Sequence, residues 1–392
     1  MKTCKYKRFL SAVGGMMVLG ATVPASAQYV IYTNKTGWFN PDGTSSRRFS
    51  VIEAAACAAG DGGVVRMSAG TYREAMRIDW GLRMEAQNGR VTIGSTLPRT
   101  KLRVITYNTH LWGDALSGEN CDDDDRAGYF GTLAYHENAI EQTDILGLQE
   151  IWDDDYAYQI QSDSNYSYRF FGKEYNGATQ HSGLLLLSRH ELYNTDQTSF
   201  DDKAGWDWFA NKGFIQATIY KDGYGIGVFN THTQADDYEE IRRKQMEQLA
   251  GAIRDYRGAN PTHPVIVMGD FNVIGETSEY SGNMSNAMGG IGAQRDGMMN
   301  FYCTDDLYAC TSCGDNEFRQ HFDSDTDEFW RLDYILYSPS KDGRVDIVPT
   351  RYEVLKWQVP EGEPDVECGD TVTREISDHY GILMEFDLHP AP

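Results

Sequence analysis

The sequence predicts an α/β fold in which two β-sheets pack face to face as a sandwich, with helices on the outside. Strand-like and helical segments alternate from Lys101 to the end of the chain, which is the order of an α/β domain. Several strand-like segments are continuous apolar runs, as expected of strands that are buried on both faces. At 392 residues, the chain is long enough to bury a large core beside a second, smaller β-rich module.

The first residues have the three parts of a secretory signal peptide. Four basic residues come first, an apolar stretch runs from Phe9 to Val23, and Ala25-Ser26-Ala27 is a small-residue cleavage site. Glycines within the apolar stretch make a permanent membrane anchor the less favoured alternative. We therefore expect the protein to be secreted, with the signal peptide 1–27 cleaved after Ala27.

The chain is strongly acidic. Its formal net charge of −23 becomes −27 once the signal peptide is removed, because that segment carries four basic residues and no acidic one. A protein of this charge repels polyanions at long range, so no nucleic acid partner is expected, although a local basic groove could override the average. An anionic membrane is disfavoured for the same reason, whereas a zwitterionic lipid head group is not.

Six cysteines remain after cleavage, and an even number in a secreted chain indicates disulfide bonds. Cys303, Cys310 and Cys313 crowd one loop, so we expect at least one bridge there. A zinc site at Cys310 and Cys313 is less favoured, because a second pair of ligands is missing. The pairing of the cysteines stays open.

Residues 28–98 are expected to form the separate β-rich module. A helix is predicted at Ser50–Ala59, and short strands are predicted at Val64–Met67 and Val91–Ile93. The Gly-Gly-Val-Val turn and the Ser-Ala-Gly-Thr-Tyr that follows resemble the opening rungs of right-handed parallel β-helices of the pectate-lyase type. A solenoid needs several rungs to bury its faces, so this module must pack on another surface. The larger domain, 99–392, is expected to follow it.

Helices and strands of the larger domain can be placed from periodicity. Helices are predicted at Gly128–Glu141 and Asp237–Tyr256, the second with apolar residues near helical spacing on one face. The acidic run Asp122–Asp125 is expected to be a solvated loop, with a calcium site as the less favoured alternative. The predicted strands include Gly183–Ser188, Phe214–Tyr220, Gly225–Asn230, Val265–Met268 and Leu332–Tyr337.

Polar residues gather at the ends of the apolar runs. Polar residues concentrated on one edge of a sheet are typical of a catalytic site on a rigid scaffold. The set holds carboxylates, carboxamides and imidazoles, with no obvious serine or cysteine nucleophile. Oxygen-rich ligands favour hard cations such as Mg²⁺, so the expected chemistry is metal-assisted attack of water on a phosphoester. The residues are Asn108, Glu150, His232, Asp270, Asn272, Asp333, Asp378 and His379.

Glu150 is the expected principal ligand of Mg²⁺, because one carboxylate together with substrate phosphate and water is how this ion is usually held. Asn108 can coordinate the ion or bind a phosphate oxygen without adding charge. Asp270 and Asn272 are two residues apart, so in an extended segment they point the same way. Asp270 can then orient the attacking water or join a second metal, and Asn272 can donate to a phosphoryl oxygen. The alternative is that these asparagines are turn residues, which is the more common role of an isolated Asn after a strand.

His379 is the candidate general base, because an acid precedes it and an imidazole needs a partner that fixes its tautomer. His232 can stabilise the transition state or protonate the leaving alkoxide. The other histidines, including His110, lack such a context and are expected to be structural or at the surface.

Six short motifs contain these polar residues: Thr106-Tyr107-Asn108, Leu148-Gln149-Glu150, Asn230-Thr231-His232, Gly269-Asp270-Phe271-Asn272, Arg331-Leu332-Asp333-Tyr334 and Ser377-Asp378-His379. In their order and spacing, these motifs resemble the endonuclease/exonuclease/phosphatase superfamily. Within it, three further segments are similar to secreted bacterial neutral sphingomyelinases: Asn211-Lys212-Gly213-Phe214, Thr231–Ala235, and Asn272-Val273 with Ser278–Tyr280. The resemblance covers Lys101–Phe386 and implies a deoxyribonuclease-I-like sandwich.

The resemblance also implies residue roles. Asp333 would be the acid that orients His379, with Asp378 lying toward the metal. The catalytic group would be His379, His232, Asp333, Asp270 and Asn272. The ligands of one or two Mg²⁺ ions, or of another divalent cation, would be Glu150, Asn108, Asp270, Asn272, Asp378 and His379.

The implied function is a secreted, Mg²⁺-dependent sphingomyelin phosphodiesterase of the sphingomyelinase C type. It would contact membranes peripherally, act on choline-containing sphingolipid, and release phosphocholine and ceramide by in-line attack of water. One alternative is a secreted nuclease or inositol-polyphosphate phosphatase of the same superfamily, whose polyanionic substrate fits poorly with the acidic chain. The other is a non-catalytic surface-binding protein, against which the complete ligand set argues.

Two features depart from the family pattern. Family sphingomyelinases often carry a second metal site on the side of the sandwich, but the matching stretch Gln180–Gly183 lacks the acidic ligands. Their membrane hairpin is not obvious near the C-terminus. Trp206, Trp208 and Phe209 could instead form an interfacial loop that touches the bilayer or cradles a choline cation. Core packing is the equally weighted alternative for these aromatic residues.

Overall fold

The computed structural model describes residues 30–33, 52–72, 81–93, 99–112, 121–172, 181–205, 211–301 and 310–391. The chain divides into two compact units, one comprising Met1–Thr96 with Met299–Leu307, the other Leu97–Met298 with Tyr308–Pro392. Within the described ranges, no helix has the length and hydropathy needed to cross a membrane. The predicted signal peptide lies outside the described residues.

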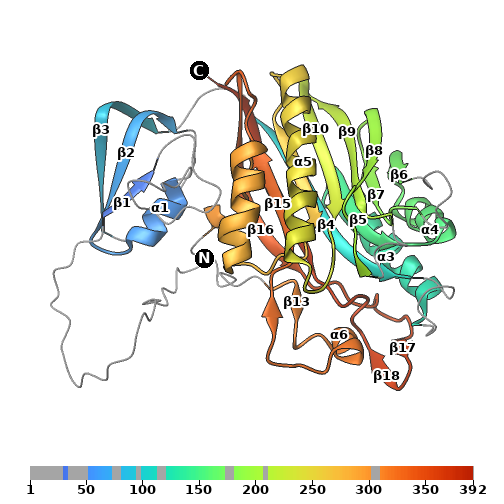
Figure 1. Ribbon diagram of the computed structural model, residues 1–392. Helices are drawn as coiled ribbons and strands as arrows, with labels where there is room; N and C mark the ends of the chain where they lie inside the picture. Colours follow the sequence, from blue (N-terminus) through green and yellow to red (C-terminus); the bar gives the residue numbers. More distant parts are fainter. Residues whose placement is uncertain are drawn as a thin grey trace, which may run out of the picture. The chain divides into compact units, whose positions relative to one another are not determined.

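Among its described residues, the first unit contains a three-stranded parallel sheet and an α-helix (Figure 1). Its strands are β1 (Val30–Thr33), β2 (Gly63–Tyr72) and β3 (Leu82–Ile93), and α1 (Ile52–Ala59) packs against β1 and β2. The predicted helix Ser50–Ala59 corresponds to α1. Parallel pairing of β2 with β3 is the pairing found in the wall of a β-helix, but the resemblance to a β-helix and the domain boundaries stay predictions.

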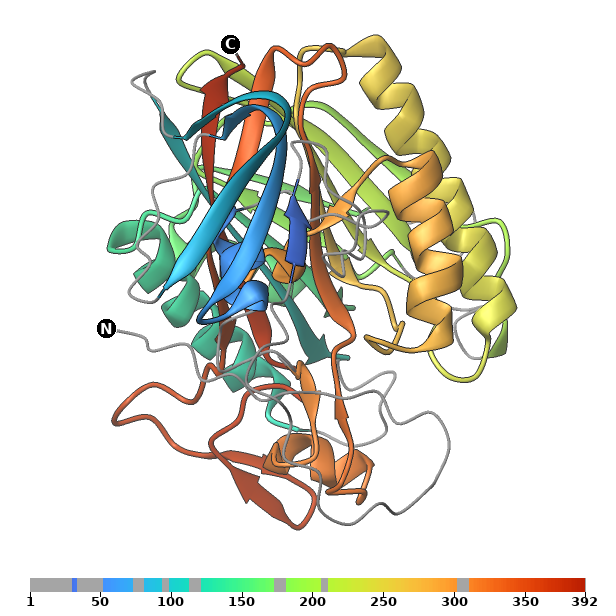
Figure 2. The ribbon, with the colours of Figure 1, turned by 90° about the vertical axis from the view of Figure 1, so that its left-hand side faces the viewer.

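Two six-stranded sheets form the sandwich of the second unit (Figures 1 and 2). Strands β4 and β5 of the first sheet pack against β11 of the second, so the two sheets face each other and the predicted sandwich is confirmed. The first sheet has the order β16 (Val345–Leu355), β19 (Gly381–Pro390), β4 (Thr100–Leu111), β5 (Ile145–Ile151), β7 (Leu185–Ser188) and β6 (Tyr168–Phe171). The second has the order β12 (Arg295–Asp296), β15 (Asp333–Ser338), β11 (Val265–Asp270), β10 (Tyr224–His232), β9 (Gly213–Lys221) and β8 (Tyr193–Ser199).

Helices α3 (Asp123–Ala139) and α4 (Asp154–Ser164) cover the outer face of the first sheet, where their apolar residues share a core with β4 and β5. The prediction that Asp122–Asp125 is a solvated loop is wrong. Three of these acids form the first turn of α3, where carboxylates interact favourably with the helix dipole. Asp123 is buried and pairs with Arg126.

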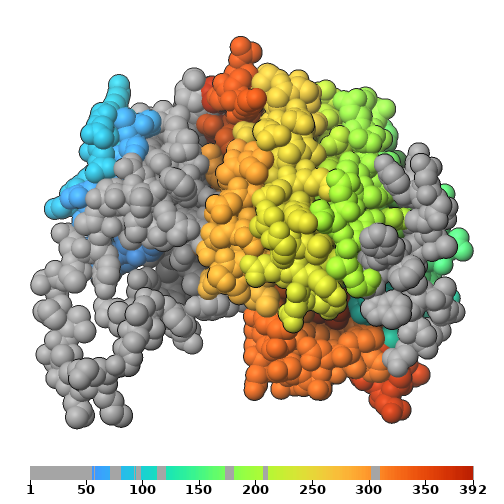
Figure 3. All heavy atoms as spheres, in the orientation of Figure 1, coloured from blue at the N-terminus to red at the C-terminus, as the bar shows by residue number. Residues whose placement is uncertain are grey.

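Helix α5 (Glu239–Ala259) covers the outer face of the second sheet and confirms the predicted helix Asp237–Tyr256. Its Tyr256 meets Phe229 of β10 edge-on, with 5.7 Å between ring centroids. The π-helix η2 (Tyr280–Ile291) packs beside α5. Together these helices form adjoining parts of the surface in Figure 3, where they are yellow and orange.

The two sheets approach closely near the ends of β5, β10 and β11. A Cβ at Gly147 of β5 would lie 2.8 Å from the sulfur of Met268, so any larger residue there would require the Met268 side chain to shift. Beside it, Gln149 Nε2 donates to Asn230 Oδ1 at 2.7 Å, and Asn230 Nδ2 donates to the carbonyl of Leu148 at 3.0 Å. These buried polar bonds connect the sheets and fix their relative register.

Short elements complete the described part of the chain, and two disulfides between described residues lie among them. The predicted bridge in the cysteine-rich loop is confirmed as Cys310–Cys313, which rules out the zinc alternative because both sulfurs are bonded. A second bridge joins Cys121 to Cys368. The short elements are η3 (Met298–Asn300), β13 (Ser312–Cys313), α6 (Glu317–Phe322), β14 (Phe329–Trp330), β17 (Val366–Cys368) and β18 (Thr371–Thr373).

Candidate active site

Strand direction brings the polar strand ends to one edge of the sandwich. In the first sheet β4 and β5 run parallel and β19 runs antiparallel to β4. In the second sheet β10 and β11 run parallel and β15 runs antiparallel to β11. The ends of β4, β5, β10 and β11 and the beginnings of β15 and β19 therefore lie at the same edge. All eight polar residues singled out in the sequence lie at or next to these strand ends.

Asn108 links the carboxylates of the two sheets. Its Nδ2 donates to Glu150 Oε1 and to Asp270 Oδ2, each at 3.0 Å. His232 Nε2 lies 3.6 Å from the same two carboxylate oxygens. Glu150 also accepts a hydrogen bond of 2.6 Å from Trp112 Nε1. Two acids, an amide and an imidazole therefore converge on one point between the sheets.

Asp333 and His379 form a buried pair next to this point. Their Oδ2 and Nδ1 atoms are 2.7 Å apart, and His379 Nε2 faces Asp270 Oδ2 at 3.9 Å. Asp333 is fully buried, and its backbone N–H donates to Thr311 Oγ1 at 3.2 Å. The carboxylate of Asp333 therefore orients the ring so that Nε2 is directed toward the acid cluster, as a general base requires.

Burial and neighbouring charges separate the protonation states of the site residues. Burial, followed by the charge of Asp333, raises the pKa of Asp270 to about 7. Burial alone would lower the pKa of His379, but nearby carboxylates, Asp333 first, raise it well above its usual value. Burial and then Lys212 lower the pKa of His232 well below its usual value. His379 is thus the basic imidazole, and His232 is a neutral one.

His110 is a site residue that the sequence analysis missed. Its Nδ1 lies 3.1 Å from Asp378 Oδ2 and 3.8 Å from Glu150 Oε2. The ring stacks on Trp112 and contacts Phe322, at centroid distances of 5.0 and 4.6 Å. His110 is therefore not a surface residue, and it has the acidic neighbours that the sequence analysis did not find. A β-bulge after Asn108 turns it toward the acids, and no local pattern in the sequence signals that bulge.

The carboxylate of Asp378 lies next to the ring of His110. Burial would raise the pKa of Asp378, but His110 and His379 together lower it below its usual value, so it is ionised. Ser377, the residue before it, donates through Oγ to the carbonyl of Asn108 at 2.7 Å. This bond joins the Asp378–His379 segment to the end of β4.

Asn272 does not lie as predicted. The strand ends at Asp270, and Asn272 has a left-handed φ of 47°, so the two residues are not in one extended segment. The N–H of Asn272 donates to Asp270 Oδ1 at 2.8 Å, and its Nδ2 donates to the carbonyl of Thr233 at 3.2 Å. The structure therefore assigns Asn272 a contact that holds Asp270, and its predicted role toward the phosphoryl group stays a prediction.

Two other predictions stay open. Trp206, Trp208 and Phe209 lie outside the described residues. In the stretch that corresponds to the side metal site of family sphingomyelinases, the ring of His181 packs on Phe171 with 4.5 Å between ring centroids, and its Nε2 is 3.7 Å from Asp154 Oδ1.

The donor set at the strand ends fits a hard divalent cation. Oxygens of Glu150 and Asp270 and a nitrogen of His232 all lie within 4.8 Å of one another. Two acids that converge in a buried place repel each other unless positive charge or donors lie between them. Carboxylate and amide oxygens are ligands for Mg²⁺ more than for soft metals. Glu150, Asp270 and Asn108 are therefore the residues that would hold the ion.

A family model confirms what this geometry indicates. Residues 93–379 match the model described as "Endonuclease/Exonuclease/phosphatase family". The chain belongs to this family. The match includes every site residue named above, from Asn108 to His379.

Curated relatives within the family are bacterial proteins of low sequence identity. Phospholipase C of Staphylococcus aureus is 23% identical over 48% of this chain and 62% of its own length. Sphingomyelinase C of Bacillus cereus is 25% identical over 46% of this chain and 59% of its own length. Sphingomyelinase C 2 of Leptospira interrogans is 25% identical over 46% of this chain and 32% of its own length. The chain thus spans less than two thirds of each of these relatives.

Solved structures of several other proteins share the fold. The beta toxin of Staphylococcus aureus superposes with a TM-score of 0.57 at 20% identity, over 72% of this chain and 99% of the toxin. SmcL superposes with a TM-score of 0.57 at 19% identity, over 73% of this chain and 98% of SmcL. TDP2 of D. rerio, crystallised with a single-stranded DNA product, superposes with a TM-score of 0.51 at 18% identity, over 73% of this chain and 99% of that TDP2 chain. At these identities the likeness shows the deoxyribonuclease-I-like sandwich and not the substrate.

Proposed function

We propose that this protein is a secreted, Mg²⁺-dependent phosphodiesterase that hydrolyses sphingomyelin to phosphocholine and ceramide. The observation that carries the proposal is the buried Asp333–His379 pair, whose free ring nitrogen faces the cluster of Glu150, Asp270 and Asn108. A base, a set of hard-cation ligands and a neutral imidazole are the parts needed for in-line attack of water on phosphorus.

The chain's own residues would divide the work as follows. His379 Nε2 takes the proton of the attacking water, and Asp333 stabilises the imidazolium that forms. His232, whose lowered pKa keeps it neutral, donates a hydrogen bond to an oxygen on which negative charge develops. When bound, Mg²⁺ would supply charge stabilisation to the phosphoryl oxygens and the leaving alkoxide. Glu150 and Asn108, with Asp270, would hold it.

The choice of lipid over nucleic acid rests on charge and on the relatives. The formal charge of −23 disfavours a polyanionic substrate at long range. Relatives named sphingomyelinase C match this chain along about half its length. A beta toxin structure from Staphylococcus aureus was solved with bound magnesium ions, which supports Mg²⁺ as the metal here.

The direct test is product analysis of the mature protein with sphingomyelin vesicles, phosphatidylcholine vesicles and DNA, each with Mg²⁺ and with a chelator. We expect phosphocholine from sphingomyelin only with Mg²⁺, and none from the Glu150→Gln variant. Cleavage of DNA without release of phosphocholine would replace the proposal by a nuclease. Secretion is checked separately, because the N-terminus of the protein in the culture medium should be Gln28.

A further inference from the structure

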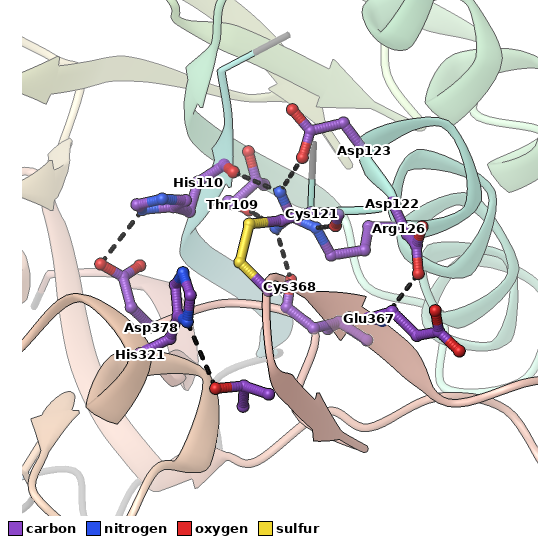
Figure 4. The surroundings of a disulfide bond; sticks show 12 residues. Thr109, His110, Cys121, Asp122, Asp123, Arg126, His321, Glu367, Cys368 and Asp378 are labelled. Atoms are coloured by element: carbon purple, nitrogen blue, oxygen red, sulfur yellow. Dashed lines mark hydrogen bonds and ion pairs between the residues drawn. A yellow bond between two sulfur atoms is a disulfide. The ribbon is translucent and has the colours of Figure 1, made fainter. Parts of the chain in front are cut away.

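Arg126 is a fully buried charged residue, and all of its N–H groups donate hydrogen bonds (Figure 4). Its Nε donates to the carbonyl of Cys121 at 2.8 Å, and Nη2 donates to the carbonyl of His110 at 2.6 Å and to Asp123. Its Nη1 donates to the carbonyls of Thr109 at 3.1 Å and of Ile376 at 3.0 Å. A guanidinium has five N–H donors, so all of them are used, four on backbone carbonyls.

These carbonyls belong to the two chain segments that carry the site. Thr109 and His110 form the bulge at the end of β4, next to Asn108. Ile376 comes directly before the segment of Ser377, Asp378 and His379. The segments are far apart in the sequence, and one planar side chain fixes the separation of their backbones.

The bulge explains why carbonyls are available to Arg126. Pairing of β4 with β5 is interrupted between Asn108 and Leu111, so the carbonyls of Thr109 and His110 lack their regular partners in the ladder. His110 has a left-handed φ of 50°, which directs its carbonyl to the guanidinium and its ring to Asp378. Below the guanidinium lies the ring of Phe318, 4.6 Å from its centre, which also contacts His110 edge-on.

We propose that Arg126 is a positioning residue of the active site, which holds the His110 bulge and the Asp378–His379 segment at a fixed separation. This inference rests on the proposed function. Arg126 touches no reacting group itself. It acts through backbone carbonyls, so a lysine, which has three donors and no planar fork, cannot replace it.

The test compares Arg126→Lys with Arg103→Lys, a matched control near the start of β4, the strand that carries the His110 bulge. Arg103 also binds a carbonyl and a carboxylate, both of Glu141, but no segment of the site. Because small misplacements of catalytic groups cost about 100-fold in rate, Arg126→Lys should lower kcat on sphingomyelin by about that factor, with KM nearly unchanged. Arg103→Lys should keep the wild-type kcat, even if both variants lose thermal stability.

A double variant separates positioning from general destabilisation. If Arg126 acts through the bulge, Arg126→Lys in a His110→Ala background should lower kcat by much less than it does alone. Arg103→Lys should have the same small effect in both backgrounds. Equal effects of Arg126→Lys in the two backgrounds, or a folded Arg126→Lys protein with wild-type kcat, would overturn the proposal.

Two further measurements keep the inference testable whatever the first variant does. If Arg126→Lys does not fold, Asp123→Ala leaves one guanidinium donor without its carboxylate and should still reduce kcat in a way that is not additive with His110→Ala. An additive or absent effect rejects the proposal. If the wild-type protein hydrolyses no phosphodiester, the proposed function fails, but NMR signals of the His110 and His379 rings should still shift in Arg126→Lys and not in Arg103→Lys.

Discussion

Replacing Asp333 by asparagine tests whether the buried carboxylate makes His379 the base. The substitution keeps the size of the side chain and removes its charge. Asp333 is fully buried, with Oδ2 2.7 Å from His379 Nδ1, and among the described residues its Oδ1 has no hydrogen-bond partner. An asparagine that still accepts from Nδ1 must therefore place its NH₂ group where no acceptor lies.

Two effects of this change have a definite direction. The unpaired buried amide should cost about 1–3 kcal/mol of unfolding free energy. The charge of Asp333 is the main factor that raises the pKa of His379 against the effect of burial, so its loss should lower that pKa. A base with a lower pKa is deprotonated at lower pH, and the acidic limb of the rate profile moves to lower pH. A weaker, less oriented base should also reduce kcat by about 10²–10⁴-fold.

The assay is kcat and kcat/KM on sphingomyelin as a function of pH at saturating Mg²⁺, with thermal unfolding measured in parallel. Asp144→Asn is the matched control, because Asp144 is another buried acid bonded to a histidine, His190 Nε2 at 2.8 Å, far from the strand ends of the site. Asp144→Asn should lower the thermal stability and leave the acidic limb of the pH–rate profile at its wild-type pH. An acidic limb of Asp333→Asn that stays fixed, or moves to higher pH, refutes the role assigned to Asp333.

Three other outcomes are expected. Glu150→Gln should fold normally and lose most activity, with partial recovery at high Mg²⁺ in a metal titration. Asp144→Asn should remove about 2 kcal/mol of unfolding free energy at neutral pH, since Lys221 loses its partner. The pKa of Asp144 is lowered in the folded state, so this contribution is present above its unfolded pKa of about 3.9 and disappears as the pH falls through the lower folded value; denaturant titrations at several pH values would show it. Replacing Trp206, Trp208 and Phe209 by alanine should weaken vesicle binding if they form an interfacial loop, or lower the melting temperature strongly if they are core residues, at roughly 3–5 kcal/mol each.

The fold and the acid cluster could be predicted because burial dictates both. Strands covered on both faces must be apolar, so the first polar residue after each run marks a strand end. Glu150, Asp270 and His232 follow such runs, and parallel neighbours place strand ends on a common edge. The pairing of Asp333 with His379 came from the family resemblance, since no local pattern relates residues so far apart in the chain.

His110 and Arg126 could not be found in this way. His110 lies inside what the sequence presents as one strand, and its contact with Asp378 depends on a bulge that is visible only once β4 is paired with β5. Arg126 follows four acidic residues and looks like part of a solvated surface. Its burial arises because the carbonyls it binds are brought together by tertiary structure, which local propensity does not encode.

Backbone strain at the strand ends gives the site its shape. His110, Glu150 and Asn272 all have left-handed φ values, 50°, 58° and 47°, a conformation that costs an L-residue about 1–2 kcal/mol and asparagine less. Each is held by a hydrogen bond to another segment: Arg126 binds the carbonyl of His110, Asn108 binds the carboxylate of Glu150, and Nδ2 of Asn272 donates to the carbonyl of Thr233. The strands provide rigidity up to these points, and the strained residues then turn their side chains or backbone groups toward a common centre. Because the same bonds oppose the strain and set the geometry, a substitution that weakens one of them should reduce activity more than its small effect on stability would suggest.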